Sequence, residues 1–147
     1  DPAIARKRTE AISIHGLVPG SEVRDYHTEE AAINSFLKWL GSDVLVAHHL
    51  GFDRTMIDLS LQRLGAGRLL NRGIDTVDLA KTLQPSGYWT PEDAFSLDHL
   101  ARRFRIPLSD RHTAQGDSYI TSVLLLKLLH RLTERRGRPL RLEDVLK

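Results

Sequence analysis

The chain has 147 residues, of which 41% are hydrophobic and 27% are charged, and its formal net charge is +2. This length and composition suit one globular domain, and the absence of cysteine excludes disulfides and thiolate metal sites. No apolar run is long enough to span a membrane, and the N-terminus lacks the apolar core of a signal peptide. No membrane partner is therefore expected, and the cytoplasm is the expected compartment.

The first half of the chain passes from a loop into alternating helix and strand patterns. Residues 1–25 carry the prolines and glycines typical of turns. A helix with one apolar face is predicted over residues 29–40, capped near Thr28. The short apolar run 43–48 predicts a strand buried on both faces. A turn then leads into a predicted helix over residues 52–64.

The second half contains one further strand pattern and two helix patterns. Residues 73–79 predict a strand or a strand-to-helix junction, and residues 84–94 predict a loop. Helices are predicted over residues 97–104, capped by the preceding serine, and over residues 113–132. The sequence Arg-Gly-Arg-Pro at 136–139 ends the second of them. Strands that alternate with helices predict an α/β layered domain, although two strands alone make a poor parallel sheet.

Basic residues are concentrated at the C-terminus. From Lys127 to Lys147 there are seven Lys or Arg and three Asp or Glu, whereas the preceding residues carry 14 basic and 16 acidic groups. One interpretation is a solvated helix end with a tail, and the other is a contact to a phosphate backbone. The arginines concerned are Arg131, Arg135, Arg136, Arg138 and Arg141.

Two segments carry residues suited to phosphodiester hydrolysis. The run His112-Thr-Ala-Gln-Gly-Asp117 and the run Val46-Ala-His-His-Leu-Gly-Phe-Asp53 each end on an aspartate at or near a helix start. Two aspartates can bind divalent cations, and a histidine can accept a proton from water near neutral pH. Open α/β folds place their sites at one end of the sheet, where these side chains could converge. A further acidic pair, which such a site needs, is not visible in the chain.

These segments resemble motifs of the DnaQ-like 3′–5′ exonuclease superfamily, in its DEDDh branch, which includes proofreading subunits of bacterial replicative polymerases and several RNases. The resemblance runs from Asp1 to about Leu132 and depends on the order and spacing of the motifs. It also includes the segments Ile12-Ser-Ile-His-Gly-Leu17, Ile74-Asp-Thr76 and Ser96-Leu-Asp98.

The resemblance implies roles for individual residues. His112 would be the general base that deprotonates the attacking water, and Asp53 and Asp117 would be metal ligands. Mg²⁺ or Mn²⁺ would be the cofactor, in a two-metal site in the complete protein. The residues implied to bind substrate are His15, Gly16 and Phe52.

The resemblance also implies the fold and the partners. The fold would be ribonuclease H-like, with a mixed central sheet flanked by helices, over residues 1–135, followed by a basic C-terminal tail over residues 136–147. The substrate would be single-stranded or 3′-terminal DNA or RNA, with DNA slightly preferred. A polymerase or another replication or repair subunit is a candidate protein partner.

The chain departs from the family pattern at two places. His49 stands where the family usually has Asn, and no strand with an Asp-x-Glu motif precedes His15. The first three strands of the family fold are therefore expected to be missing. The preferred explanation is a longer protein whose upstream segment forms them. The alternatives are a second chain that completes the sheet, or a degenerate relative without activity.

Other polar residues are expected to have structural roles. Asp75 with Thr76 is interpreted as a turn and helix cap. His48 and His49 make a poor chelate, because adjacent strand residues point to opposite faces. The residues expected to be surface or capping groups are Asp78, Asp98 and His99. The loop aromatics that could stack on a base or anchor the loop are Tyr88 and Trp89.

Two other functions are compatible with parts of the sequence. One is a catalytically inactive exonuclease-like scaffold or binding module. The other is a helix-turn-helix regulator, formed by residues 96–109 and the helix that follows them. That second helix has a densely apolar face, whereas a recognition helix needs exposed polar side chains. The helix-turn-helix interpretation also leaves residues 46–53 unexplained.

Overall fold

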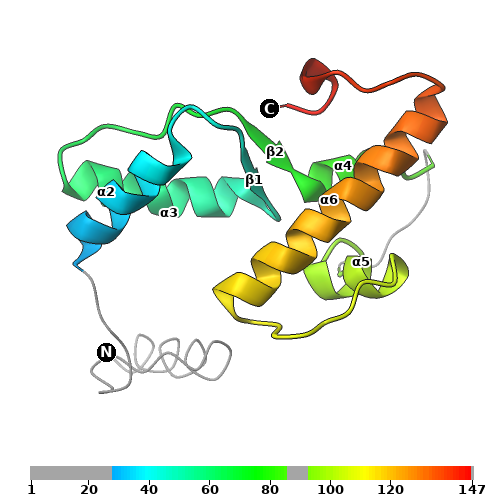
Figure 1. The fold of residues 1–147 in the computed structure, drawn as a ribbon, viewed down its shortest axis with the longest axis horizontal. Coiled ribbons are helices and arrows are strands. Elements are labelled where there is room, and N and C mark those ends of the chain that lie inside the picture. The colour runs from blue at the N-terminus through cyan, green and yellow to red at the C-terminus, as the bar shows by residue number, and fades with distance from the viewer. Residues whose placement is uncertain (1–27, 86–92, 147) are drawn as a thin grey trace.

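The computed structural model describes residues 28–85 and 93–146 of the chain (Figure 1). His15, Gly16, Tyr88 and Trp89 therefore lie outside the described residues. The elements in chain order are α2 (Glu29–Leu40), β1 (Leu45–Ala47), α3 (Leu50–Arg63), β2 (Gly73–Asp75), α4 (Thr76–Thr82), α5 (Leu97–Arg103), α6 (Ala114–Arg136) and the 3-10 helix η1 (Leu142–Asp144).

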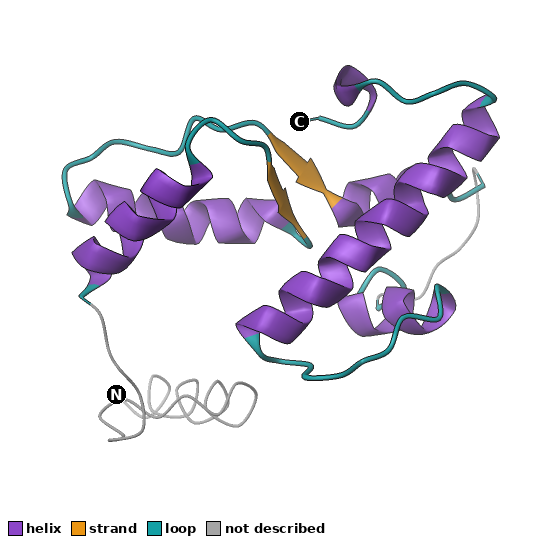
Figure 2. Ribbon diagram, in the orientation of Figure 1, coloured by secondary structure: helices purple, strands orange, loops and turns teal. Residues whose placement is uncertain are grey.

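The two strands pair in parallel and lie between two groups of helices (Figure 2). Helices α2 and α3 lie on one side, and α4, α5 and α6 lie on the other (Figure 1). The side chains of β1 follow this division: Leu45 packs against α2 and α3, whereas Val44 and Val46 pack against the core of the other group. A helix-rich molecule with a small parallel sheet is compatible with the α/β exonuclease fold that the sequence predicts.

The larger core is built along α6. Ile120, Leu124 and Leu128 follow one another at intervals of four residues and have no exposed surface. They pack with fully buried Leu100 of α5 and with Ile74 of β2. This burial argues against α6 as a recognition helix, because its central apolar face is already occupied by the core.

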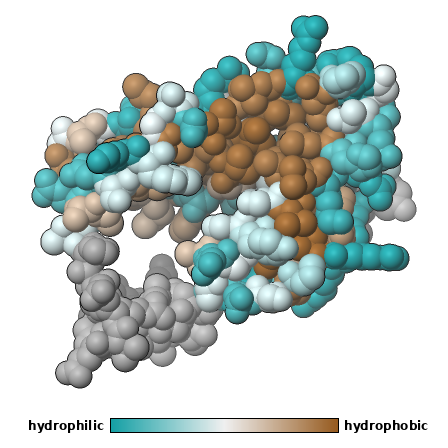
Figure 3. All heavy atoms as spheres, viewed as in Figure 1, coloured by the Kyte–Doolittle hydropathy of each residue, from teal (hydrophilic) through white to brown (hydrophobic). Residues whose placement is uncertain are grey.

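On the face drawn in Figure 3, apolar residues gather near the strands and over the adjoining part of α6. Leu140 and Val145, beyond the end of α6, also pack against the larger core. No helix among the described residues is long and apolar enough to cross a membrane. The domain boundary after residue 135 remains a prediction.

Several element boundaries agree with the sequence and others do not. The helices α2 and α5 begin where predicted: Thr28 Oγ1 accepts the N–H of Ala31 at 3.2 Å, and Ser96 Oγ accepts the N–H of His99 at 3.2 Å. β1 is shorter than the predicted 43–48, and its residues are half-buried instead of fully buried. Each described strand has one hydrogen-bonded neighbour, which leaves the other edge of β1 unpaired within these residues.

The ends of the two longest helices also differ from prediction. α3 begins at Leu50, so the turn expected before residue 52 is instead the first turn of the helix. α6 continues four residues beyond the predicted end at Leu132 and stops at Gly137, whose φ of 64° is left-handed. A glycine tolerates that conformation, so α6 extends beyond the apolar pattern and ends within the Arg-Gly-Arg-Pro segment predicted to end it.

Asp75, which is 7% exposed, explains why α3 begins before the predicted residue 52. One carboxylate oxygen accepts the N–H of His49 at 3.2 Å, and the other accepts the N–H of Leu50 at 3.0 Å. The same group caps α4 by accepting the N–H of Val77 at 3.0 Å. One carboxylate therefore caps two helices, which confirms the predicted capping role and extends it to α3.

His48 joins three segments at the end of β1. Its Nδ1 lies 2.8 Å from Thr76 Oγ1, and its Nε2 lies 2.9 Å from the carbonyl oxygen of Phe95. Because a carbonyl can only accept, Nε2 carries the proton and Nδ1 accepts the Thr76 hydroxyl. Burial is the main reason that the pKa of His48 is lowered, and the charge of His49 adds to it. The ring is therefore neutral, and both its nitrogens are in use.

The prediction that His48 and His49 point to opposite faces is wrong. Their ring centroids are 4.9 Å apart and the rings are nearly perpendicular, at 79°. The strand ends at Ala47, and His49 has a left-handed φ of 65°, so the alternation of a strand does not apply. The conclusion that the pair is a poor chelate still holds, because His48 has no free nitrogen.

The lowered pKa of His48 predicts a pH-dependent stability. Between its usual pKa near 6.5 and the lower folded value, the unfolded chain binds more protons than the folded chain. The free energy of unfolding should thus be highest above that usual value and fall on acidification, by at most about 1.4 kcal/mol per pH unit. Urea unfolding at a series of pH values measures this slope. His48→Gln keeps one hydrogen-bond donor and one acceptor but does not titrate, so it should flatten the dependence of the unfolding free energy on pH. An unchanged slope would show that His48 is not the group responsible.

Candidate functional site

A depression of about 650 Å³ lies where both strands end. This is the edge of an α/β sheet at which binding sites are normally found. The depression also lies at the start of α3, where Asp75 accepts the N–H groups of His49 and Leu50. The lining residues are His48, His49, Gly51, Phe52, Asp53 and Asp75.

Asp53 lies in the first turn of α3 and faces this depression. Although the residue is exposed overall, partial loss of water around its carboxylate raises the pKa of Asp53, and the charge of Asp75 raises it further. Two negative groups at one site favour a bound cation. The neighbouring side chain of Phe52 is 70% exposed, so its ring is available for contact with a flat ligand.

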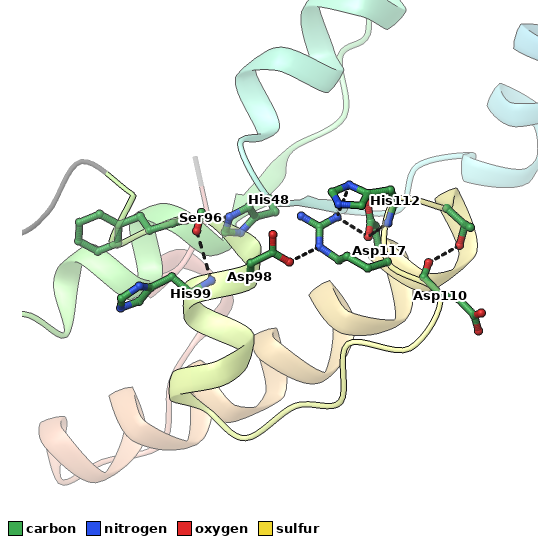
Figure 4. Close-up of polar contacts among 10 residues, drawn as sticks. His48, Ser96, Asp98, His99, Asp110, His112 and Asp117 are labelled. Carbon is green, nitrogen blue, oxygen red and sulfur yellow. Dashed lines mark hydrogen bonds and ion pairs between the residues drawn. The ribbon is translucent and has the colours of Figure 1, made fainter. Parts of the chain in front are cut away.

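The second group of site residues surrounds the start of α6 (Figure 4). Asp117 Oδ1 accepts the backbone N–H of His112 at 3.1 Å and accepts Arg111 Nη1 at 2.6 Å. Arg111 Nε also donates to Asp98 Oδ1 of α5 at 2.6 Å. The other oxygen of Asp117, Oδ2, accepts no hydrogen bond from the described residues. One oxygen thus fixes the orientation of the carboxylate, and the other has no donor in the described ranges.

Sequence reasoning missed the roles of Asp98 and Arg111. Asp98 was expected to be a surface or capping group, but it forms an ion pair with Arg111, 13 residues away in the chain. No periodicity connects the two residues, because a loop separates them. The only available signal was the arginine that directly precedes the histidine of the motif.

His112 adopts a conformation that its neighbours support. Its φ of 67° is left-handed, which is uncommon for a residue other than glycine. The loop is closed by Thr113, whose Oγ1 donates to the Asp110 carbonyl at 2.6 Å and accepts the N–H of Gly116 at 3.0 Å. His112 itself is exposed, so its imidazole can exchange protons with water or substrate.

The structure joins His112 to Asp117 through the backbone N–H of His112, and it places Asp53 in the depression at the strand ends. The charge of Arg111 contributes to the lowered pKa of His48, so the guanidinium lies within electrostatic reach of the end of β1. Within the described ranges, no group of three or more Asp, Glu or His side chains has a metal-binding arrangement. The carboxylate oxygens of Asp53 and Asp117 have the chemistry that Mg²⁺ or Mn²⁺ prefers, but they form an incomplete ligand set.

Comparison with known proteins gives an independent result. The model of the RNase T family, described as "Exonuclease", matches residues 5–125 of the chain. Similar curated proteins include the DNA polymerase III PolC-type proteins of Staphylococcus aureus and of its strains MW2 and USA300. Each is 30% identical over 105 residues, which cover 71% of this chain and 7% of the relative. The chain thus matches only a small part of these relatives, and no solved structure matches it.

Gly116 packs so closely against the loop before α6 that a side chain at position 116 is predicted to disturb that loop. A Cβ on Gly116 would lie 2.1 Å from the carbonyl oxygen of Asp110 and 2.6 Å from its carbon, both of them backbone atoms. Gly116→Ala should therefore lower the free energy of unfolding by about 1–3 kcal/mol and displace the His112 loop.

Denaturant unfolding of the variant measures this loss. The matched control is Gly51→Ala in the first turn of α3, where a Cβ would meet nothing within 4 Å. Its free energy of unfolding should stay within about 1 kcal/mol of the unsubstituted chain. Equal effects of the two substitutions would show that the loop is not packed as described.

Proposed function

This chain belongs to the DnaQ-like exonuclease superfamily, and on that basis we propose that it is part of a metal-dependent 3′–5′ exonuclease. The family match supports a nuclease that acts on nucleic acid. The finer assignment depends on one structural observation above all, the hydrogen bond from the backbone N–H of His112 to Asp117 at the start of α6.

His112 is proposed as the general base. Its exposed imidazole would accept a proton from water, and the water oxygen would attack the terminal phosphorus. The bond from phosphorus to the 3′ oxygen of the preceding nucleotide would then break, and that oxygen would take a proton. The products would be a nucleoside monophosphate and a strand one nucleotide shorter.

Asp53 and the Oδ2 of Asp117 are proposed to hold Mg²⁺ or Mn²⁺. When bound, the cation would neutralise charge that develops on the phosphoryl oxygens. The raised pKa of Asp53 supports this role, because a carboxylate that lies close to Asp75 gains from a neighbouring cation. Phe52, exposed beside Asp53, is proposed to contact the terminal base. His15 and Gly16 remain proposals from the sequence.

Further carboxylates are needed for two cations. We assign them to an Asp-x-Glu motif on the first of three strands formed by an upstream segment, with a second chain as the alternative source. The half-buried residues of β1 support this proposal, since Val46 and its neighbours would be covered by an additional strand. The ribonuclease H-like sheet would then be complete.

DNA is proposed as the preferred substrate, by a small margin over RNA. The support is the name of the similar Staphylococcus aureus proteins, DNA polymerase III PolC-type, which places those relatives in replication. A polymerase or another replication or repair subunit is proposed as the partner for the same reason. The sequence and geometry of the described residues contain no contact that distinguishes a 2′-hydroxyl.

The central test uses the full-length protein and labelled single-stranded oligonucleotides of matched DNA and RNA sequence. We expect release of mononucleotides from the 3′ end in the presence of Mn²⁺ and no release in EDTA. In a competition, the DNA strand should be degraded somewhat faster. Absence of metal-dependent release from both substrates would instead favour the inactive scaffold or binding module, and a clear RNA preference would reverse the DNA assignment.

The roles of the individual residues predict different kinetic defects. His112→Ala should lower kcat by about 10²–10⁴-fold and leave substrate binding nearly unchanged, because a general base acts in the chemical step. Asp53→Ala and Asp117→Ala should lower both kcat and the affinity for Mn²⁺, which a Mn²⁺ titration of activity measures. His99→Ala is the matched control, since His99 lies on α5 and its side chain makes no polar contact with the described residues. Near-normal turnover in the His112 variant would show that His112 is not the general base.

A further inference from the structure

A second groove, of about 1150 Å³, lies between α4, α5 and α6. It is lined by residues from the second half of α6 and from the end of α5, and it shares no lining residue with the depression at the strand ends. Five basic side chains and one carboxylate, Glu134, line it. The basic residues are Arg103, Arg105, Lys127, Arg131 and Arg135.

The basic side chains of this groove lack acidic partners within the described part of the chain. Glu134 contacts His130 at 3.4 Å and no arginine. Arg135 donates to the carbonyl oxygen of Thr82, which leaves its charge uncompensated. By contrast, Arg136 and Arg138 are both paired with Asp144. The C-terminal basic residues thus divide into a group near η1 that is ion-paired with Asp144 and a group in the groove without acidic partners among the described residues.

The spacing of the charges suits a linear polyanion. Lys127, Arg131 and Arg135 follow one another at intervals of four residues, so they form a row along α6 with a rise of about 6 Å per step. Arg103 and Arg105 lie across the groove from this row, at the end of α5. Like charges held together without anions repel one another, and this repulsion is relieved when a negatively charged chain lies between them.

The floor of the groove includes two apolar side chains, Leu83 and Phe104. Both residues are half-buried, so part of each keeps an exposed surface. A chain with phosphates along its length and flat bases on one side can contact both the basic rim and this floor. Single-stranded nucleic acid has this combination, and arginine, which predominates here, is well suited to phosphate.

We propose that the groove binds the phosphate backbone of a single-stranded nucleic acid, at a position remote from the site of hydrolysis. The proposal rests on the proposed function only for the class of substrate. Along α6 the distance from Asp117 to Lys127 is about 15 Å, and to Arg135 about 27 Å. A single nucleotide at Asp117 therefore cannot reach the groove, whereas a longer strand can reach it.

The first experiment measures binding alone. Fluorescence anisotropy with a labelled 20-nucleotide DNA strand, in EDTA and over a range of salt concentrations, uses the full-length protein and the double variant Lys127→Gln/Arg131→Gln. Loss of two phosphate contacts should weaken binding about tenfold at low salt and reduce the slope of log affinity against log salt by about 1.4. The control is Arg68→Gln/Arg72→Gln, which removes the same charge from exposed positions elsewhere and should bind within about twofold of the unsubstituted protein.

A second measurement separates this proposal from the proposed function. A chromogenic nucleoside phosphodiester is too short to reach the groove, so the double variant should hydrolyse it at the unsubstituted rate while the KM for the 20-nucleotide strand rises. If the unsubstituted protein hydrolyses neither substrate, the proposed function fails, but weaker strand binding by the double variant still supports the groove. Unchanged strand binding by the double variant overturns the proposal. Binding of a labelled polyglutamate peptide is measured in the same way, and the proposal is also overturned if the double variant loses binding to the peptide but not to the nucleic acid.

Discussion

The buried carboxylate of Asp75 is the interaction on which the described structure depends. Its oxygens accept three backbone N–H groups, from His49, Leu50 and Val77, and these belong to the first turns of two helices. A buried charge is costly unless it is hydrogen-bonded, and here the N–H groups at two helix starts supply both bonds and a favourable dipole. β1, β2, α3 and α4 are thereby fixed at one point, and Asp53 is placed one turn away from it.

A similar arrangement holds the region around the start of α6, but its charged groups are less buried than Asp75 and therefore lose less hydration. Asp98, Arg111 and Asp117 form a chain of two ion pairs, and Asp117 also accepts the N–H of His112. These groups are partly exposed, so each pair contributes at most about 1 kcal/mol to stability. Their importance is geometric: α5, the loop and α6 are joined at the residues that the proposed chemistry needs. In both regions a carboxylate orders the backbone through hydrogen bonds from N–H groups.

The distribution of charge has a consequence that the net charge of +2 does not reveal. Near η1, Asp144 forms ion pairs with both Arg136 and Arg138. Hydrogen bonds from Arg138, from the backbone N–H of Arg141 and from Arg136 lower the pKa of Asp144. Along α6 the basic residues that line the open groove have no carboxylate partner among the described residues. The one carboxylate in the lining of the groove, Glu134, contacts His130 instead. The same helix thus begins at Asp117, a proposed metal ligand, and ends at the basic surface that is proposed to bind a polyanion.

The sequence by itself determined the order of helices and strands, the caps at Thr28 and Ser96, the structural role of Asp75 and the family, because these depend on local patterns and motif spacing. It did not determine the start of α3, the proximity of the His48 and His49 rings, or the pairing of Asp98 with Arg111. Nor did it separate the paired arginines from the unpaired ones. Each of these depends on groups that are distant in the chain and meet only when the strands pair and the helices pack. Local periodicity contains no information about such contacts, so only the tertiary structure decided them.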